Sequence, residues 1–125
     1  MHDFSISQQI AHHVIRKVEE EKATEVLEIK IKIGELTHLN PEQLTFWLRE
    51  FFRQTPASRA KILIEKTPPI IQCKKCKYEG KVRVKKEDTY LFYFLAPFTC
   101  PRCGSDEVEV ISGRECLLER IKIKR

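Results

Sequence analysis

Four cysteines stand in two Cys-x-x-Cys pairs, Cys73 with Cys76 and Cys100 with Cys103. Two intervening residues let one tight turn direct both sulfurs at a single ion, and four thiolates make the closed tetrahedral site typical of structural Zn²⁺. An iron–sulfur centre or a redox-active dithiol uses the same residues, so both stay open as alternatives. The spacing predicts a four-cysteine metal site, with zinc as the expected ion.

The segment that carries these pairs, about 35 residues, is too short for a core of its own, so the metal must supply its folding energy. Gly104, directly after Cys103, predicts a left-handed residue in the second turn, and Gly80 is expected to serve the first pair in the same way. The fifth cysteine, Cys116, lies in the apolar phase of a strand and is expected to be a buried, inert thiol.

The second residue of the chain is a histidine, His2. The amine of Met1 with the backbone nitrogen and imidazole of His2 can close fused five- and six-membered chelate rings, and the amide nitrogen or carboxylate of Asp3 can add a fourth donor. Nitrogen donors in one plane suit Ni(II) or Cu(II) better than tetrahedral Zn(II). A histidine in second place does not by itself establish a site. The other histidines lack ligand spacing and are expected to bind no metal: His12, His13 and His38.

The net charge of +5 comes entirely from residues 72–105, which hold eight bases and three acids, because bases and acids balance elsewhere. Such a basic segment can bind nucleic acid. It can equally offset the formal −2 charge of a zinc ion held by four thiolates. No stacking-aromatic motif is interleaved with the basic residues, which favours the second interpretation.

A length of 125 residues with 42% hydrophobic content predicts a folded protein of one domain, or of one domain with a smaller lobe. No apolar run approaches the ~20 residues of a membrane span, and the N-terminus lacks the layout of a secretory signal, so we expect a cytoplasmic protein without membrane contact. No nucleophile–base pair or glycine-rich phosphate loop is visible, so we expect no enzymatic activity.

Helical and strand periodicities alternate along the chain. Ser5-x-x-Gln8 matches a capping box and predicts a helix over 5–21, and Asn40-Pro41 predicts a second helix over 41–54. Alternation predicts strands over 26–33, with Leu27 on the apolar face, and over 61–66 and 114–124, the last with a bulge near residues 117–119.

These elements predict an α+β fold: a small mixed lobe of two helices on a three-stranded sheet, with a zinc-ribbon-like lobe inserted before the last strand. The expected domains are residues 1–71 plus 108–125 for the first lobe and 72–107 for the second.

The opening Met1-His2-Asp3-Phe4-Ser5 resembles the start of the HypA family, the nickel-insertion accessory proteins of [NiFe]-hydrogenase maturation, where Met-His-Glu is usual. The resemblance continues in Ile33-Gly34-Glu35-Leu36, in the proline-led helix, in Cys100-Pro-Arg-Cys103-Gly104-Ser105 and in the final strand. It therefore covers essentially the whole chain.

The resemblance implies that residues 1–71 plus 108–125 form a nickel-binding domain with His2 as the essential nickel ligand, Met1 and Asp3 as contributors, and the paired cysteines as zinc ligands. Nickel would be transported cargo and zinc a structural cofactor. The implied partners are the GTPase HypB and the hydrogenase large subunit, with urease served in some organisms. We expect a monomer or weak homodimer.

Two departures from the family pattern concern the nickel site. Asp3 replaces the usual glutamate and is one methylene shorter, and Asn40 stands where some relatives have an acidic residue.

The sequence thus supports the hypothesis of a nickel metallochaperone that is not an enzyme. The alternative hypothesis is a zinc-ribbon adaptor that binds nucleic acid through its basic lobe, a function that would fall steeply with salt and be indifferent to His2.

Overall fold

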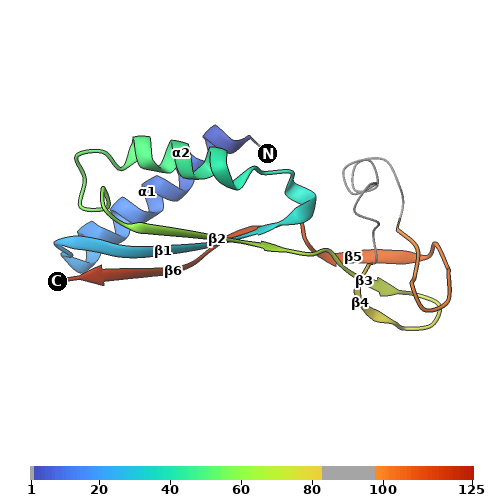
Figure 1. Cartoon of the computed structure of the whole chain (residues 1–125). Helices are drawn as coiled ribbons and strands as arrows, with labels where there is room; N and C mark the ends of the chain where they lie inside the picture. Colours follow the sequence, from blue (N-terminus) through green and yellow to red (C-terminus); the bar gives the residue numbers. More distant parts are fainter. Residues whose placement is uncertain (1, 83–97) are drawn as a thin grey trace. The chain divides into compact units, whose positions relative to one another are not determined.

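The computed structural model describes residues 2–82 and 98–125, which divide into two compact units (Figure 1). Unit 1 comprises residues 1–33, 38–65 and 116–125, and unit 2 comprises residues 34–37 and 66–115. The assignment of a function to each predicted domain stays a prediction.

Unit 1 consists of two helices on one face of a three-stranded sheet (Figure 1). The helices are α1 (Asp3–Glu21) and α2 (Pro41–Phe51), which pack against each other. The strands lie in the order β2-β1-β6, with bounds Lys61–Thr67, Glu25–Gly34 and Cys116–Lys124. The predicted α+β fold class is confirmed, and β1 is the central strand.

The start of α1 differs from the prediction. The helix begins at Asp3, two residues earlier than expected, because the carbonyl of His2 accepts the N–H of Ile6 at 3.0 Å. The N-cap is therefore His2, in an extended conformation, and not Ser5. The predicted capping box is wrong, since a capping box needs its serine in front of the first turn.

The start of α2 is as predicted. The side-chain oxygen of Asn40 accepts the N–H groups of Glu42 and Gln43 at 2.8 and 3.3 Å, and Pro41 occupies the first helical position. Leu39 and Leu44, on either side of this turn, are both buried, as in a hydrophobic staple. The helix ends at Phe51, earlier than the predicted residue 54.

Two register shifts set which residues of the sheet face the helices. Val26 pairs with Ile123 and Glu28 with Lys122, so Leu27 is an extra residue and is 46% exposed. The expectation that Leu27 faces the core is wrong, because this bulge transfers the inward position to Val26. A second shift leaves Glu119 as the extra residue of β6, which confirms the predicted bulge there.

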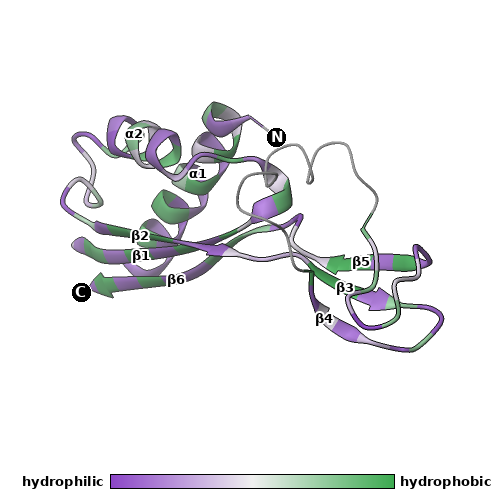
Figure 2. Ribbon diagram, turned by 45° about the vertical axis from the view of Figure 1, so that its right-hand side comes forward, coloured by the Kyte–Doolittle hydropathy of each residue, from purple (hydrophilic) through white to green (hydrophobic). Residues whose placement is uncertain are grey.

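The core of unit 1 lies between the helices and the sheet, and hydrophobic and hydrophilic residues alternate along its strands (Figure 2). Its fully buried large side chains come from both helices, from β1 and from the C-cap residue of α2: Val14, Val26, Ile29, Ile31, Ile33, Leu44, Leu48 and Phe52. Ser7 is buried among them, and its hydroxyl donates to the carbonyl of Asp3 at 2.6 Å. The apolar periodicity of the two helices thus builds one core.

Unit 2 contains a second three-stranded sheet in the order β4-β3-β5, formed by β3 (Ile70–Cys73), β4 (Glu79–Lys81) and β5 (Val108–Ser112), with a short 3-10 helix at Glu35–Thr37. Both pairings are antiparallel. The residue pattern does not predict these strands, because three to five residues are too few to show a clear alternation.

Candidate metal centres

The structure brings the four predicted cysteines together in unit 2. Their sulfur atoms all lie within 4.8 Å of one another. Cys73 Sγ is 3.7 Å from Cys103 Sγ, and Cys76 Sγ is 3.6 Å from Cys100 Sγ. Within the described residues, this is the sole group of three or more His, Cys, Asp or Glu side chains that could share a metal ion.

These distances fit a zinc ion. Tetrahedral coordination with Zn–S bonds of about 2.3 Å places the sulfurs about 3.8 Å apart, because a tetrahedron's edge is about 1.63 times its centre-to-vertex distance. A disulfide needs sulfurs about 2.05 Å apart, and all five cysteines are free. The sulfurs are therefore spaced for a metal between them.

The two Cys-x-x-Cys turns have the same backbone pattern. The N–H groups of Lys75 and Cys76 both donate to Cys73 Sγ at 3.4 Å, and in the second turn those of Arg102 and Cys103 donate to Cys100 Sγ at 3.4 and 3.5 Å. Amide donors of this kind stabilise a thiolate, the form that binds metal.

Each turn closes on a left-handed residue directly after its second cysteine. Gly104 has φ +77° and donates to the carbonyl of Cys100 at 2.8 Å, and Lys77 has φ +67° and donates to that of Cys73 at 3.2 Å. The expectation for Gly80 is wrong, because Gly80 pairs with Ile71 within the sheet. Lys77 therefore carries the backbone strain of the first turn.

The pKa values of the clustered thiols also favour the binding of a cation. The N–H of Cys76, together with that of Lys75, lowers the pKa of the Cys73 thiol to about 6. The N–H of Ser105 acts to lower the pKa of Cys103, but desolvation and the neighbouring sulfurs raise it to about 11. Since the last thiol cannot ionise beside its charged neighbours, four thiolates need a bound cation.

The predicted nickel ligands lie at the start of α1 in unit 1. His2 is exposed at the N-cap, and Met1 lies outside the described residues. The first backbone N–H groups of a helix have no acceptor within it. The backbone nitrogens of His2 and Asp3 therefore stand outside the hydrogen-bond ladder of α1, where a metal can compete for them.

The Asp3 carboxylate is engaged elsewhere. Its Oδ1 accepts the backbone N–H of Asn40 at 2.9 Å, which links the first turn of α1 to the N-cap of α2. The sequence predicts Asp3 as a nickel donor but does not predict this bond, because no local signal pairs residues 37 positions apart.

The comparisons with known proteins agree over the whole chain. The family model described as "Hydrogenase/urease nickel incorporation, metallochaperone, hypA" matches residues 1–123. The chain belongs to the HypA family. It is 39% identical over 125 residues to the hydrogenase maturation factor HypA of Methanothermobacter thermautotrophicus, covering 100% of this chain and 98% of that one. It is 32% identical over 135 residues to HypA of Pyrococcus horikoshii, covering 100% and 97%.

Solved HypA structures share the fold. The solution structure of the Ni metallochaperone HypA from Helicobacter pylori matches 99% of this chain and 98% of its own, with a TM-score of 0.65 and 17% identity. A second HypA solution structure matches with a TM-score of 0.69. The predicted resemblance to HypA is confirmed, and with it the role of a nickel-incorporation metallochaperone with a four-cysteine metal site.

Four basic residues of this HypA-family chain lie within its two cysteine turns or directly beside them. Lys74, Lys75, Lys77 and Arg102 are exposed, and none forms an ion pair within the described part of the chain. The predicted basic segment also includes Arg83, Lys85 and Lys86, which lie outside the described residues. The described cations stand where they offset a negative metal–thiolate centre.

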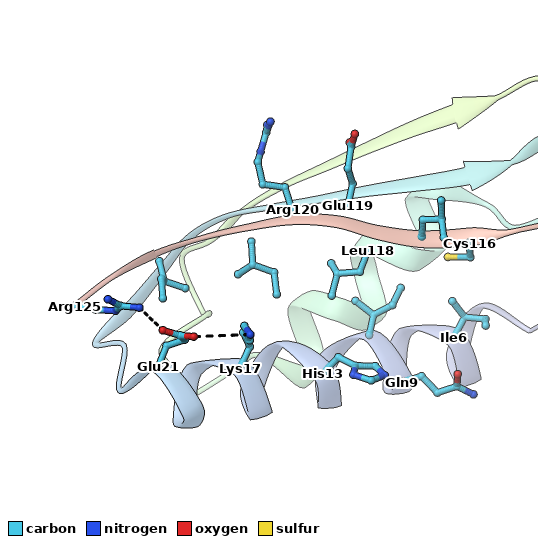
Figure 3. Close-up of a pocket in the computed structure, with 14 residues that line it drawn as sticks. Ile6, Gln9, His13, Lys17, Glu21, Cys116, Leu118, Glu119, Arg120 and Arg125 are labelled. Atoms are coloured by element: carbon cyan, nitrogen blue, oxygen red, sulfur yellow. Dashed lines mark hydrogen bonds and ion pairs between the residues drawn. The ribbon is translucent and has the colours of Figure 1, made fainter.

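A groove of about 690 Å³ lies in unit 1 of this HypA-family chain, between α1 and β6. Figure 3 shows Cys116 and Leu118 pointing from β6 toward α1, while Glu119 and Arg120 point away. Burial raises the pKa of the Cys116 thiol.

None of the described helices is long and apolar enough to cross a membrane.

Proposed function

We propose that this chain binds Ni(II) at its N-terminus and delivers it during the maturation of [NiFe]-hydrogenase or urease. The donors are the Met1 amine, the backbone nitrogen and imidazole of His2, and the backbone nitrogen of Asp3. The observation that carries the proposal is the position of His2, exposed at the N-cap of α1. Because the Asp3 carboxylate is bonded to Asn40, the Asp3 amide is the better fourth donor.

The helix end favours this donor set electrostatically. A bare cation at a helix N-terminus meets the positive end of the helix dipole. When Ni(II) displaces the amide protons of His2 and Asp3, two negative nitrogens take their place, so the charge next to the helix falls to about zero.

The displacement of protons by nickel also makes binding sensitive to acid. The affinity should fall as the solution is made more acidic, because protons compete with Ni(II) for the same imidazole, amine and amide lone pairs.

An exposed chelate also suits delivery. No closed protein shell surrounds an N-cap residue, so a partner can approach and exchange ligands one at a time. We propose the GTPase HypB and the hydrogenase large subunit as the proteins involved in this exchange.

We propose further that the four cysteines hold a structural zinc ion. Zinc supplies folding energy by linking the two turns. Unit 2 needs that link because its buried apolar residues, among those described, are few: Pro69, Ile71, Cys73, Phe98 and Cys100. In this proposal residues 1–71 plus 108–125 form the nickel-binding domain and residues 72–107 the zinc-binding domain.

The test is a Ni²⁺ titration of untagged protein with zinc content measured in parallel. The parent should bind about one nickel per chain, His2→Ala should bind little, and zinc should be unchanged in both. His12→Ala is the matched control, since His12 is also an exposed histidine of α1. An N-terminal extension should act like His2→Ala, because it removes the free amine or shifts its register. Equal nickel uptake by all four proteins would refute the assignment.

The same variants test the nucleic-acid alternative. Binding of duplex DNA or RNA that falls steeply with salt and is unchanged in His2→Ala would favour the adaptor over the chaperone.

A further inference from the structure

An aromatic patch lies on the helices of unit 1, made of Phe4 from α1 and Phe46, Trp47 and Phe51 from α2. The Trp47 ring is the centre. Phe4 meets it edge to face at 4.9 Å between ring centroids, Phe46 at 5.0 Å, and Phe51 lies at 6.5 Å. Residues from two helices thus form one continuous aromatic surface.

The outer rings of the aromatic patch are open to solvent. Phe4 is 45% exposed and Phe46 is 53% exposed, whereas Trp47 and Phe51 are half-buried and anchor them. A single exposed apolar residue is ordinary, but a contiguous cluster indicates an interaction surface. Tryptophan and other aromatic side chains anchored in this way are the usual energetic centres of protein–protein interfaces.

The position and charge of the aromatic patch limit its partner. Phe4 is two residues after His2, so a protein docked here lies next to the proposed nickel donors. Glu42, one helical turn before Phe46, is exposed, and its carboxylate forms no ion pair within the described residues. A complementary partner therefore offers an apolar pocket with a basic group at its rim.

The groove between α1 and β6 lacks such a signal. Its charged side chains are already paired. Glu21 pairs with Lys17 and Arg125 (Figure 3), and Arg120 pairs with Glu28. No unsatisfied charge there selects a partner.

We propose that the aromatic patch is the docking surface for the protein that takes up the nickel held at His2. This inference rests on the proposed function. Docking through aromatic rings supplies affinity that does not depend on the metal donors. The complex can then persist while each Ni–N bond to this chain breaks as a bond to the acceptor forms, and the released amide nitrogens take protons back from water.

The experiment uses full-length Phe46→Ser with HypB as the probe. Phe46 is chosen over Phe4 because it is not next to the nickel donors. Leu27→Ser is the matched control, since Leu27 is a similarly exposed apolar residue, 46%, outside the aromatic patch. We expect Phe46→Ser to bind nickel within about twofold of the parent and to bind HypB at least ~10-fold more weakly, with slower nickel transfer. Leu27→Ser should match the parent in all three.

The result separates the two proposals. Loss of nickel binding in His2→Ala tests the proposed function, whereas HypB affinity without nickel tests docking. Unchanged HypB affinity in Phe46→Ser would overturn the docking proposal, as would failure of the parent to bind HypB. Loss of self-association in Phe46→Ser with unchanged HypB binding would also overturn it, because the occupant would then be a second copy of this chain.

Discussion

The carboxylate of Asp3 accepts the backbone N–H of Asn40 at 2.9 Å, while the Asn40 side chain caps α2. One short segment of α1 is thereby tied to the start of the second helix, and the exposed His2 stands directly in front of this tie. The bond occupies the Asp3 side chain with the start of α2, so in the proposed nickel site only the backbone nitrogen of Asp3 serves as a donor.

The first prediction separates these tasks. Asp3→Asn keeps a side-chain oxygen and should bind one nickel per chain with an affinity within about tenfold of the parent. Asp3→Ala should lose about 1 kcal/mol of unfolding free energy, because the Asn40 N–H loses its acceptor. Nickel titration and urea unfolding check the two effects. Loss of nickel from a folded Asp3→Asn would mean that the carboxylate itself is a donor.

The second prediction concerns the cap of α2. Asn40→Ala removes the acceptor of the Glu42 and Gln43 N–H groups and should cost about 1 kcal/mol of unfolding free energy. Asn40→Asp keeps a capping oxygen and should be close to the parent in the same urea titration. Equal losses in both variants would show that the cap is not the cause.

The third prediction concerns metal removal. Chelation at neutral pH, or Cys103→Ser, should abolish the order of unit 2 while leaving the helices of unit 1 intact, because the whole hydrophobic core cluster lies in unit 1. Amide hydrogen exchange would show protection lost in β3 and β5 and kept in α1 and β1. Retained protection in β3 of the metal-free protein would contradict a structural role for the ion.

The fourth prediction concerns the close approach of two glycines. A Cβ on Gly34 would lie 2.0 Å from the carbonyl oxygen of Gly113, so Gly34→Ala must displace backbone and should cost about 2–3 kcal/mol. Gly80→Ala is the control, since its Cβ would meet only the hydroxyl end of Tyr78, which can rotate away. The comparison is by thermal unfolding, and equal shifts in Tm would argue against the clash.

The fifth prediction concerns pH. The hydrogen bond from Arg120 to Glu28, with Lys122 nearby, lowers the pKa of Glu28 from the ordinary value of a glutamate. A depressed folded-state pKa stabilises the protein above the unfolded value, and this contribution is lost as the pH falls through the folded value.

The variant that isolates this contribution is Glu28→Gln. It should therefore be less stable than the parent at pH 7 and equally stable in strong acid. Trp47, the sole tryptophan and part of unit 1, reports unfolding by fluorescence. Glu42→Gln, which loses no ion pair among the described residues, should show no such convergence.

Features that depend on neighbouring residues can be predicted from the amino-acid sequence. The spacing of Cys73 with Cys76 and of Cys100 with Cys103 predicts two turns with converging sulfurs. Asn40-Pro41 fixes the start of α2. These predictions hold because each depends on backbone geometry within a few residues, where residue types dictate conformation.

Features that depend on residues far apart in the chain are seen only in the folded protein. Leu27 is exposed because the register of β1 against β6 places a bulge there, and α1 begins at Asp3, whose side chain meets Asn40 on another helix. The left-handed Lys77 has no sequence signal, since only the geometry required at the cysteine cluster imposes that conformation on a non-glycine residue. Periodicity shows which apolar residues lie on the same face of a helix or strand, but the packing of a partner element decides which of them are buried.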